Sequence, residues 1–384
     1  MAMEDLQPSP PRNLAHAGKY STKTILFDIT FEILFRIPPK SIIRFQSVSK
    51  LWLSIIRSKE FVDSFLARSK TRPRLLFTFK QFESPKRFIF STPEHQKNDN
   101  STTAIAARHD MTISGFFDYV RSPPVNGFVC FTRGSSILVC NLTTRQIVKL
   151  PDVESNEKDM FVRLGYDPVE DQYKVLCLIM FDGDDANQQD HIQQKHFVFT
   201  LSSQQKEWRK IENTTGDDHR TVFGGISIDG AIYYGVENEV IVRFDVRTEK
   251  LELIQVPEEF HITTTYYSTL LNYTRKLGDL EMRLWIIEWS KMTYTLPSEW
   301  DGLLGDYVRP KSVMHSGELN VVYPRLQSSR YRFGVCYYDV KGERISRMEI
   351  PGIGDDYSRI RLGIGKRSLE ILSFLGYVEN IRVL

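Results

Sequence analysis

The spacing of hydrophobic positions changes twice along the chain. The residues up to about Ser21 are polar and rich in proline, which is typical of a disordered tail because little apolar burial offsets the entropy of ordering. From Thr24 to Lys70 hydrophobic residues recur at helical spacing, and beyond Arg72-Pro73 they recur at every second position. This pattern predicts a disordered tail over residues 1–22, a small all-α module over residues 23–70 and an all-β domain over residues 71–384.

The helical module is expected to hold three or four short helices. The apolar stripe of the first comprises Ile29, Ile33, Leu34 and Ile37. Pro38-Pro39 end this helix because proline lacks an N–H donor. A second helix is expected from about Lys40, a third after a capping Ser49, and a fourth in EFVDSFLARS. A module of about 45 residues cannot bury all of its large apolar side chains, so the surplus is expected to face a partner.

The segment ILFDITFEILFRIPPKSIIRFQSVSKLWLSII resembles the F-box. The matching positions are Asp28, Glu32, Ile33, Leu34, Arg36, Ile37, Pro38, Ser41, Arg44, Val48, Ser49, Lys50, Trp52 and Ile56. The resemblance implies binding to a Skp-type adaptor, which links to a cullin scaffold. It also implies a set of adaptor-binding residues, some of them part of the module's own core: Ile29, Ile33, Leu34, Pro38, Val48 and Trp52. Periodicity alone equally allows a helical bundle packed against the rest of the chain.

One position departs from the F-box pattern. The proline that normally precedes the first helix is replaced by Leu26. We expect this change to fix the helix start less sharply and to lower the affinity for the adaptor. Trp52 fits internal packing as well as adaptor contact, because a buried indole serves either role.

The second half of the chain is expected to be nearly all strand. Its short runs are rich in Val, Ile, Phe and Tyr, with Gly, Asn, Asp and Pro between them; examples are FVCF, SILVC, YKVLCLIM, AIYYGV and FGVCYYDV. Aromatic residues in such strands are interpreted as core or cross-strand pairs rather than as the lining of a ligand cleft. These aromatic residues include Tyr233, Tyr234, Trp285, Trp289, Tyr337 and Tyr338.

A three-fold internal repeat is visible in this half. VCNLTTRQIVKLP, RFDVRTEKLELIQVP and YYDVKGERISRMEIP each read as strand, turn, strand and proline, with Asn141, Asp245 and Asp339 at the turns. The copies start about 95 to 105 residues apart, roughly two units of a repeat the length of a propeller blade. About six such units fit the domain, so we predict a degenerate kelch-like β-propeller, with stacked β-sandwiches as the alternative.

This half also resembles the F-box-associated interaction domain found in plant F-box proteins. The resemblance is carried, in order, by RPRLLFTF, GYDPVEDQYKVLCL, TLSSQQKEWRKIE, GGISIDGAIYYG, IVRFDVRTEKLELIQVPE and LLNYTRKLGDL. It covers nearly the whole chain after the F-box-like segment. The resemblance implies a kelch-like propeller that recognises a target protein.

Composition narrows the partners and the compartment. Lys plus Arg number 50 and Asp plus Glu number 48, so the formal charge of +2 gives no field that would attract nucleic acid or anionic lipid. The four cysteines follow no zinc or disulfide pattern, which favours a reducing compartment. The N-terminus lacks a signal-peptide pattern, and no stretch approaches the ~18–20 apolar residues of a membrane span. We therefore expect the cytoplasm or the nucleus.

Two motifs that suggest ligand binding are incomplete. Asp182, Asp184 and Asp185 begin like a calcium loop, but Ala186 stands where a ligand is needed. Gly363-x-Gly365-Lys366 lacks the first glycine of a phosphate-binding loop. We interpret the first as a solvated loop and the second as a turn.

Candidate catalytic and metal-binding residues also fail on spacing. Gly225-x-Ser227 lacks the last glycine of a nucleophile elbow. His191 and His196 are five residues apart in a predicted polar loop, which suits neither a helical nor a strand metal pair. No catalytic set, metal or cofactor is therefore predicted.

These inferences lead to a non-catalytic substrate-recognition subunit of an SCF-type cullin-RING E3 ubiquitin ligase. The F-box would bind the Skp-type adaptor, and propeller loops would bind an unknown target protein. We expect the target-binding residues in the longer polar loops, at residues 182–195, 213–222 and 296–318. Two alternatives stay open: a kelch-type propeller enzyme or glycan-binding lectin, and an adaptor-bound F-box scaffold without ligase activity.

Overall fold

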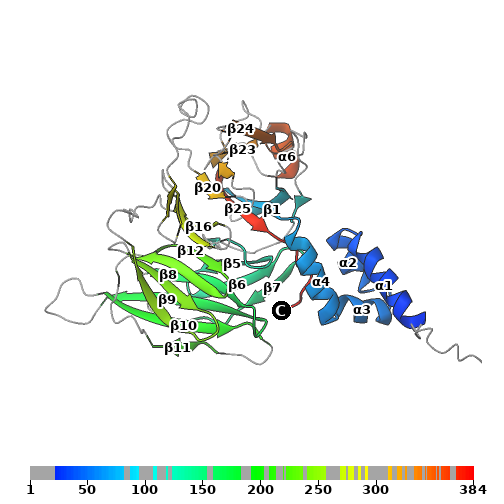
Figure 1. Cartoon of the computed structure of the whole chain (residues 1–384), viewed down its shortest axis with the longest axis horizontal. Coiled ribbons are helices and arrows are strands. Elements are labelled where there is room, and N and C mark those ends of the chain that lie inside the picture. The colour runs from blue at the N-terminus through cyan, green and yellow to red at the C-terminus, as the bar shows by residue number, and fades with distance from the viewer. Residues whose placement is uncertain are drawn as a thin grey trace, which may run out of the picture. The chain divides into compact units, whose positions relative to one another are not determined.

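The computed structural model divides the chain into two compact units, Met1–Phe61 and Val62–Leu384 (Figure 1). The residues that it describes are 22–81, 87–94, 107–109, 118–119, 123–153, 159–182, 192–202, 207–212, 219, 222–236, 240–256, 269–273, 276–280, 284–286, 290–292, 310–313, 318–321, 325–326, 333–339, 342, 344–351, 353, 356–363 and 369–384. The predicted disordered tail lies outside the described residues, apart from Thr22.

Helices open the described chain: α1 (Thr22–Phe35), α2 (Pro39–Phe45), α3 (Lys50–Arg57) and α4 (Lys59–Lys70). Pro39 occupies the first position of α2, where the missing N–H has no helical partner to lose. Ser49 caps α3, because its side-chain oxygen accepts a hydrogen bond of 3.2 Å from the backbone N–H of Trp52. The predicted series of short helices is confirmed, and the division between the two units falls inside α4.

Leu26 lies inside α1, which already begins at Thr22. A proline is tolerated only in the first turn of a helix, because further in it removes a hydrogen bond and clashes with the preceding turn. Leucine at this position therefore allows the helix to extend towards the N-terminus. The departure from the F-box pattern thus falls in the second turn of α1 and is compatible with the helix starting at Thr22.

The core of the first unit combines aromatic and aliphatic side chains. The ring of Phe61 stacks on Phe35 at 5.1 Å and meets the edge of Phe31 at 5.0 Å. Aliphatic residues that are buried in the same unit are Leu34, Ile42, Ile55 and Ile56. Phe61 therefore joins the start of α4 to α1.

The second unit contains six antiparallel sheets among its described residues, numbered here I to VI. Sheet I is β4 (Asp118–Tyr119), β5 (Phe128–Arg133), β6 (Ser136–Asn141) and β7 (Gln146–Lys149); sheet II is β8 (Asp159–Asp167), β9 (Gln172–Asp182), β10 (Ile192–Thr200) and β11 (Arg209–Ile211); sheet III is β12 (Val222–Ile228), β13 (Ala231–Val236), β14 (Val240–Asp245) and β15 (Leu251–Gln255). Sheet IV is β16 (Thr269–Tyr273), β17 (Lys276–Leu280), β18 (Leu284–Ile286) and β19 (Ser290–Met292); sheet V is β20 (Pro310–Val313), β21 (Leu319–Val321), β23 (Gly334–Asp339) and β24 (Arg344–Glu349); sheet VI is β22 (Arg325–Leu326), β25 (Leu369–Tyr377), β1 (Arg74–Gln81), β2 (Arg87–Pro93) and β3 (Ala107–Arg108). Helix α6 (Asp356–Leu362) lies between β24 and β25 in the chain.

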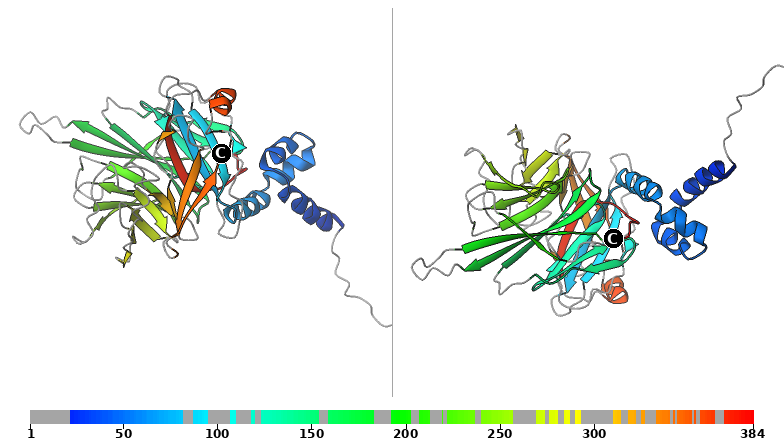
Figure 2. Two further views of the ribbon diagram at one scale, coloured as in Figure 1. Left: turned by 90° about the horizontal axis from the view of Figure 1, so that it is seen from above. Right: turned by 90° about the horizontal axis from the view of Figure 1, so that it is seen from below.

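The sheets form a closed ring in which each contacts the next. Strand contacts join sheets I and II, II and III, III and IV, IV and V, and V and VI. A hydrophobic cluster containing Leu76, Val129 and Tyr377 joins sheet VI back to sheet I. Within sheet VI the last strand, β25, pairs with the first, β1 (Figure 2). Phe77 lies opposite Ser373 in this pairing. The predicted β-propeller is confirmed, and the alternative of stacked sandwiches is wrong because the two ends of the β-domain close one ring.

The internal repeat falls on alternate sheets. Its three copies form β6–β7 of sheet I, β14–β15 of sheet III and β23–β24 of sheet V. Sheets II and IV lie between them, which confirms that the repeat spacing covers two blades. Two of the predicted turn residues act as expected, because the side chains of Asn141 and Asp245 accept hydrogen bonds from the backbone N–H groups of Thr143 and Thr248.

Asn141 also holds the C-terminal end of the chain. Its side-chain nitrogen donates hydrogen bonds of 2.9 Å to the carbonyl oxygens of Asn380 and Arg382. Asn141 is fully buried, so its side-chain amide is satisfied by these carbonyl groups. Asp245, at the equivalent turn of sheet III, forms an ion pair of 3.0 Å with Arg243 instead. The residue at this turn thus anchors the C-terminal residues in sheet I, whereas the equivalent residue in sheet III forms a partly exposed ion pair.

Asn141→Asp is expected to lower the free energy of unfolding of the propeller by about 3 kcal/mol, because it replaces a buried donor by a carboxylate facing two carbonyl oxygens. Urea denaturation measures this loss. The matched substitution Asp245→Asn keeps the turn and weakens only a partly exposed ion pair, so a loss below about 1 kcal/mol is expected. Equal losses in the two variants would contradict the closing role of Asn141.

Candidate functional site

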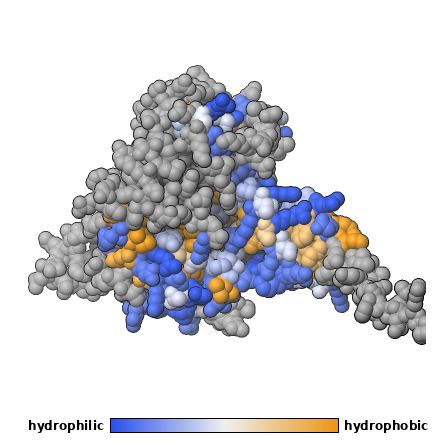
Figure 3. All heavy atoms as spheres, in the orientation of Figure 1, coloured by the Kyte–Doolittle hydropathy of each residue, from blue (hydrophilic) through white to orange (hydrophobic). Residues whose placement is uncertain are grey.

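Large hydrophobic side chains remain exposed on the first unit. Ile29, Ile33, Val48 and Leu51 are 54, 50, 62 and 63% exposed, and we call them the exposed apolar set. Ile29 and Ile33 are one turn apart on α1, so they share a face, and with Glu32 and Arg36 they line a shallow hollow. Figure 3 shows hydrophobic surface over the helices of this unit. Exposed apolar groups gathered on so small a unit indicate a site for a protein partner.

The predicted adaptor-binding residues divide between surface and core. Ile29, Ile33, Pro38 and Val48 are exposed. Leu34 is fully buried, so it supports the fold of the helices rather than offering a contact surface. Trp52 is half-buried, and its ring packs against Phe45 at 5.2 Å. The role of these residues in adaptor binding stays a prediction.

Leu51 is a surface residue that helical periodicity assigns to the interior. It lies four residues before Ile55 on α3, and residues at this spacing share a helix face. Ile55 is buried, whereas Leu51 in the first turn is exposed. The sequence does contain a surplus of apolar residues in this short segment. The surplus predicts that some apolar side chains stay exposed, but it does not show which ones.

Strand direction divides the connections of the propeller between two faces. Helix α4 leads into β1 at Arg74, and the pairing of Arg74 with Tyr377 places the end of β25 on the same face, called here the helix-side face. Turns of sheets I and II lie on it too, because residues 378–384 contact them through Asn126, Asn141 and Asp171. Neighbouring strands run antiparallel, so the chain crosses from one face to the other along each strand. The connections from the second to the third strand of a sheet, and from one sheet to the next, therefore start and end at the opposite face.

The predicted target-binding loops are flanked by strand ends of the opposite face. These flanking residues are Asp182 and Ile192, Ile211 and Val222, and Met292 and Pro310. Residues 183–191, 213–218 and 293–309 lie outside the described residues. The loop prediction is wrong for Asp182, residues 192–195, Val222 and residues 310–313, which belong to β9, β10, β12 and β20. Polar side chains there did not prevent backbone pairing, as Gln194 opposite Met180 shows.

His196 is buried in β10, contrary to the prediction of a loop histidine, and His191 lies outside the described residues. The Nε2 atom of His196 is 3.5 Å from the hydroxyl of Tyr234. Burial, followed by the charge of the nearby His219, lowers the pKa of His196 to about 4. His196 is therefore neutral at neutral pH. No cluster of three His, Cys, Asp or Glu side chains suited to a metal occurs among the described residues.

The glycine pair Gly224-Gly225 serves packing between sheets II and III. The register of β12 shifts between Phe223 and Ile226, and both glycines have positive φ angles of 61° and 134°. The guanidinium of Arg163 fills the space beside Gly225 and donates to the carbonyl oxygen of Gly224. The Gly225-x-Ser227 motif is thus part of a strand with a bulge, as expected for a segment that is no nucleophile elbow.

Gly363 and the four cysteines are the remaining candidates in the sequence for a chemical role. Gly363 lies directly after α6 with a φ of 72°, and Gly365 and Lys366 of the same motif lie outside the described residues. The four cysteines Cys130, Cys140, Cys177 and Cys336 are buried free thiols. Burial raises the pKa of the Cys130 thiol to about 12, which leaves it a poor nucleophile. None of the described helices combines the length and apolarity needed to cross a bilayer.

The stability of the propeller is expected to fall by about 2 kcal/mol between pH 7 and pH 5 because of His196. Its folded pKa of about 4 lies below the ordinary value of 6.5, so acid protonates the unfolded state first, and stability present at pH 7 is lost as the pH falls. Urea denaturation at the two pH values measures the change. His196→Gln, which cannot take up the proton, is expected to remove this part of the pH dependence; an unchanged pH dependence in the variant would contradict it.

Comparison with known proteins identifies both units. Residues 27–64 match the F-box domain, and residues 74–378 match the F-box associated beta propeller domain. F-box protein At1g30790 of Arabidopsis thaliana is 34% identical, over 94% of this chain and 98% of its own. F-box protein DOR and F-box/kelch-repeat protein At3g04660 of the same plant are 31% and 29% identical, over 94% and 90% of this chain and 94% and 92% of their own.

A helical F-box followed by a β-propeller is an architecture typical of non-catalytic adaptor proteins. The chain belongs to the family of F-box proteins that carry an F-box associated beta-propeller domain. Both resemblances seen in the sequence are thereby confirmed.

Proposed function

We propose that this chain is the substrate-recognition subunit of an SCF-type cullin-RING ubiquitin ligase, in which the F-box binds a Skp-type adaptor and the propeller binds a target protein. The observation that carries the proposal is the exposed apolar set on a unit that matches the F-box domain. A unit this small has little core with which to cover such side chains, and partner binding would bury them. The proposal places the protein in the cytoplasm or the nucleus, where ubiquitin is attached to its targets.

The chain would act by proximity. Binding a target through one part and the ligase through another turns ubiquitin transfer into a reaction within one complex, where the effective concentration of the acceptor lysine reaches the millimolar range (about 1 mM for short flexible linkers). The bond-forming steps belong to other subunits. The chemistry of this chain is therefore limited to holding two partners at a defined separation.

We propose the opposite face of the propeller, away from the helix-side face, as the target-binding face. The helix-side face is covered in part by residues 378–384, whose backbone and side chains are engaged with Asn126, Asn141 and Asp171. The opposite face receives the connections between neighbouring sheets, whose length and sequence are free to vary without disturbing the strands.

Replacing Ile33 and Val48 together by serine is expected to weaken adaptor binding at least tenfold, or about 1.4 kcal/mol, because both exposed side chains would lose apolar burial at the interface. Calorimetry with a purified Skp-type adaptor measures the affinity. The melting temperature is expected to stay unchanged, because neither side chain is buried in the free protein.

Ile147→Ser serves as the matched control, since Ile147 is 40% exposed on β7 of the propeller and should not affect adaptor binding. Leu34→Ala is the opposite case, a change in the core. It removes a fully buried side chain and is expected to lower the free energy of unfolding by about 2–5 kcal/mol.

If the parent chain fails to retain the adaptor, the proposed function is wrong. If it retains the adaptor but reconstituted ligase transfers no ubiquitin, an adaptor-bound scaffold is the better account.

A further inference from the structure

The last seven residues, 378–384, form a strap across the helix-side face of sheets I and II. Val378 and Ile381 are buried, and Asn380 is fully buried. Asn380 donates a hydrogen bond of 2.7 Å to the carbonyl oxygen of Asn126, and its backbone N–H donates one of 3.0 Å to Thr143 Oγ1. A run of chain so thoroughly bonded has a fixed path.

The surroundings of the strap are shaped to receive it. Gly127 has a φ of 87°, and a Cβ atom there would lie 2.6 Å from the carbonyl oxygen of Val378. At the far end Leu384 exchanges two hydrogen bonds with the side chain of Gln146, of 2.9 and 3.0 Å. The strap is therefore a built part of the propeller.

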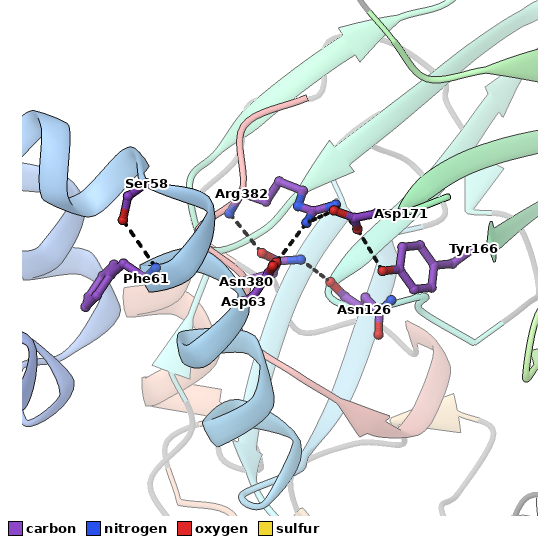
Figure 4. Close-up of polar contacts among 8 residues, drawn as sticks. All are labelled: Ser58, Phe61, Asp63, Asn126, Tyr166, Asp171, Asn380 and Arg382. Atoms are coloured by element: carbon purple, nitrogen blue, oxygen red, sulfur yellow. Dashed lines mark hydrogen bonds and ion pairs between the residues drawn. The ribbon is translucent and has the colours of Figure 1, made fainter. Parts of the chain in front are cut away.

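Arg382 is the charged centre of the strap. Its guanidinium forms a bidentate pair with Asp171, with hydrogen bonds of 2.6 and 2.8 Å, and Asp171 also accepts one of 2.7 Å from the hydroxyl of Tyr166 (Figure 4). The Arg382 side chain is 16% exposed. Bidentate geometry and partial burial fix the direction of the guanidinium.

The same guanidinium reaches helix α4. Arg382 Nη2 donates a hydrogen bond of 3.1 Å to Asp63 Oδ1 (Figure 4). Two residues earlier, Phe61 packs against Phe31 and Phe35 of α1. One continuous helix thus carries a side chain of the F-box core and, two positions later, a carboxylate held by the end of the propeller chain.

We propose that Arg382 is a positioning residue for ubiquitin transfer: by holding Asp63 it restrains α4 on the propeller, and through α4 it limits the range of positions the F-box takes relative to the bound target. This inference rests on the proposed function. Restraining a connecting element raises the effective concentration of the reacting groups by removing arrangements in which they do not meet. The strap gives the propeller a means of directing the F-box that needs no contact with adaptor or target.

A distance measurement between the two units tests the restraint directly, in the free full-length protein. Cysteines introduced at Ser54 on α3 and at Lys250 beside β15, both exposed, accept spin labels, whereas the four native thiols are buried. The width of the distance distribution is read by double electron–electron resonance. We expect Asp63→Ala and Arg382→Ala to broaden the distribution, and Asp63→Glu, which keeps a carboxylate, to restore most of the parent width.

Arg209→Ala is the matched control. Arg209 forms a comparable bidentate pair with Glu249, of 2.6 and 2.8 Å, between sheets II and III. Its loss should leave the width of the distribution unchanged. The proposal is overturned if Asp63→Ala and Arg382→Ala leave the parent width unaltered, or if Arg209→Ala broadens it as much as they do.

A second measurement connects the restraint to function. In a ligase reconstituted with a Skp-type adaptor, cullin, RING subunit and charged conjugating enzyme, the acceptors are the lysines of this chain itself. Asp63→Ala is expected to slow transfer by at least about threefold and to spread ubiquitin over more lysines, with unchanged affinity for the adaptor. An unchanged rate and lysine pattern would overturn the positioning role. Failure of the proposed function is separate, because it would appear in the parent chain as absent adaptor binding while the distance measurement still reports on the strap.

Discussion

The pairing of β25 with β1 is the constraint on which the rest of the second unit depends. It joins Tyr377 to Arg74, residues from opposite ends of the β-domain, and so turns a row of sheets into a ring. Without it, sheets V and I would each expose an apolar face that now packs against sheet VI. Closing so long a loop costs little more entropy than closing a shorter one, because the cost grows only with the logarithm of length. A few well-bonded residues, Asn141 and Asn380 among them, are therefore enough to hold the ends together.

Ring closure also explains the composition of the strands. In sheet II alternate residues of β9 face different neighbours: Val175, Cys177 and Ile179 pack towards sheet I, and Leu176, Leu178 and Met180 towards sheet III. Both faces are buried, so the run YKVLCLIM is hydrophobic throughout instead of alternating with polar residues. The apolar side chains of β9 are thus buried between neighbouring blades. Local disturbance of one blade is transmitted to its neighbours through these shared clusters.

Much of this arrangement could be predicted from the sequence, because local rules decide it. Proline positions set the helix ends, Ser49 caps α3, and the repeated Asx turns reveal the two-blade spacing. What could not be predicted depends on partners distant in the chain. Nothing near His196 shows that sheet III will bury it, and nothing near Asn141 shows that residues 380 and 382 need its donor groups. The apolar stripe of α1 is one pattern in the sequence, yet burial divides it between Leu34 and the exposed Ile29 and Ile33.

Helix α4 shows how a single element serves two units. Successive residues of an α-helix are rotated by about 100°, so Phe61 and Asp63 point about 200° apart, to nearly opposite sides of the helix. One side supplies an aromatic ring to the core of the F-box, where packing against Phe31 and Phe35 is insensitive to salt. The other supplies a carboxylate, 43% exposed, to Arg382. A partly exposed ion pair adds little to the free energy of unfolding and is screened by salt, so the hold of Arg382 on Asp63 weakens as the salt concentration rises. The hydrophobic contact therefore ties the start of α4 to α1, and the polar contact ties Asp63 of the same helix to the strap.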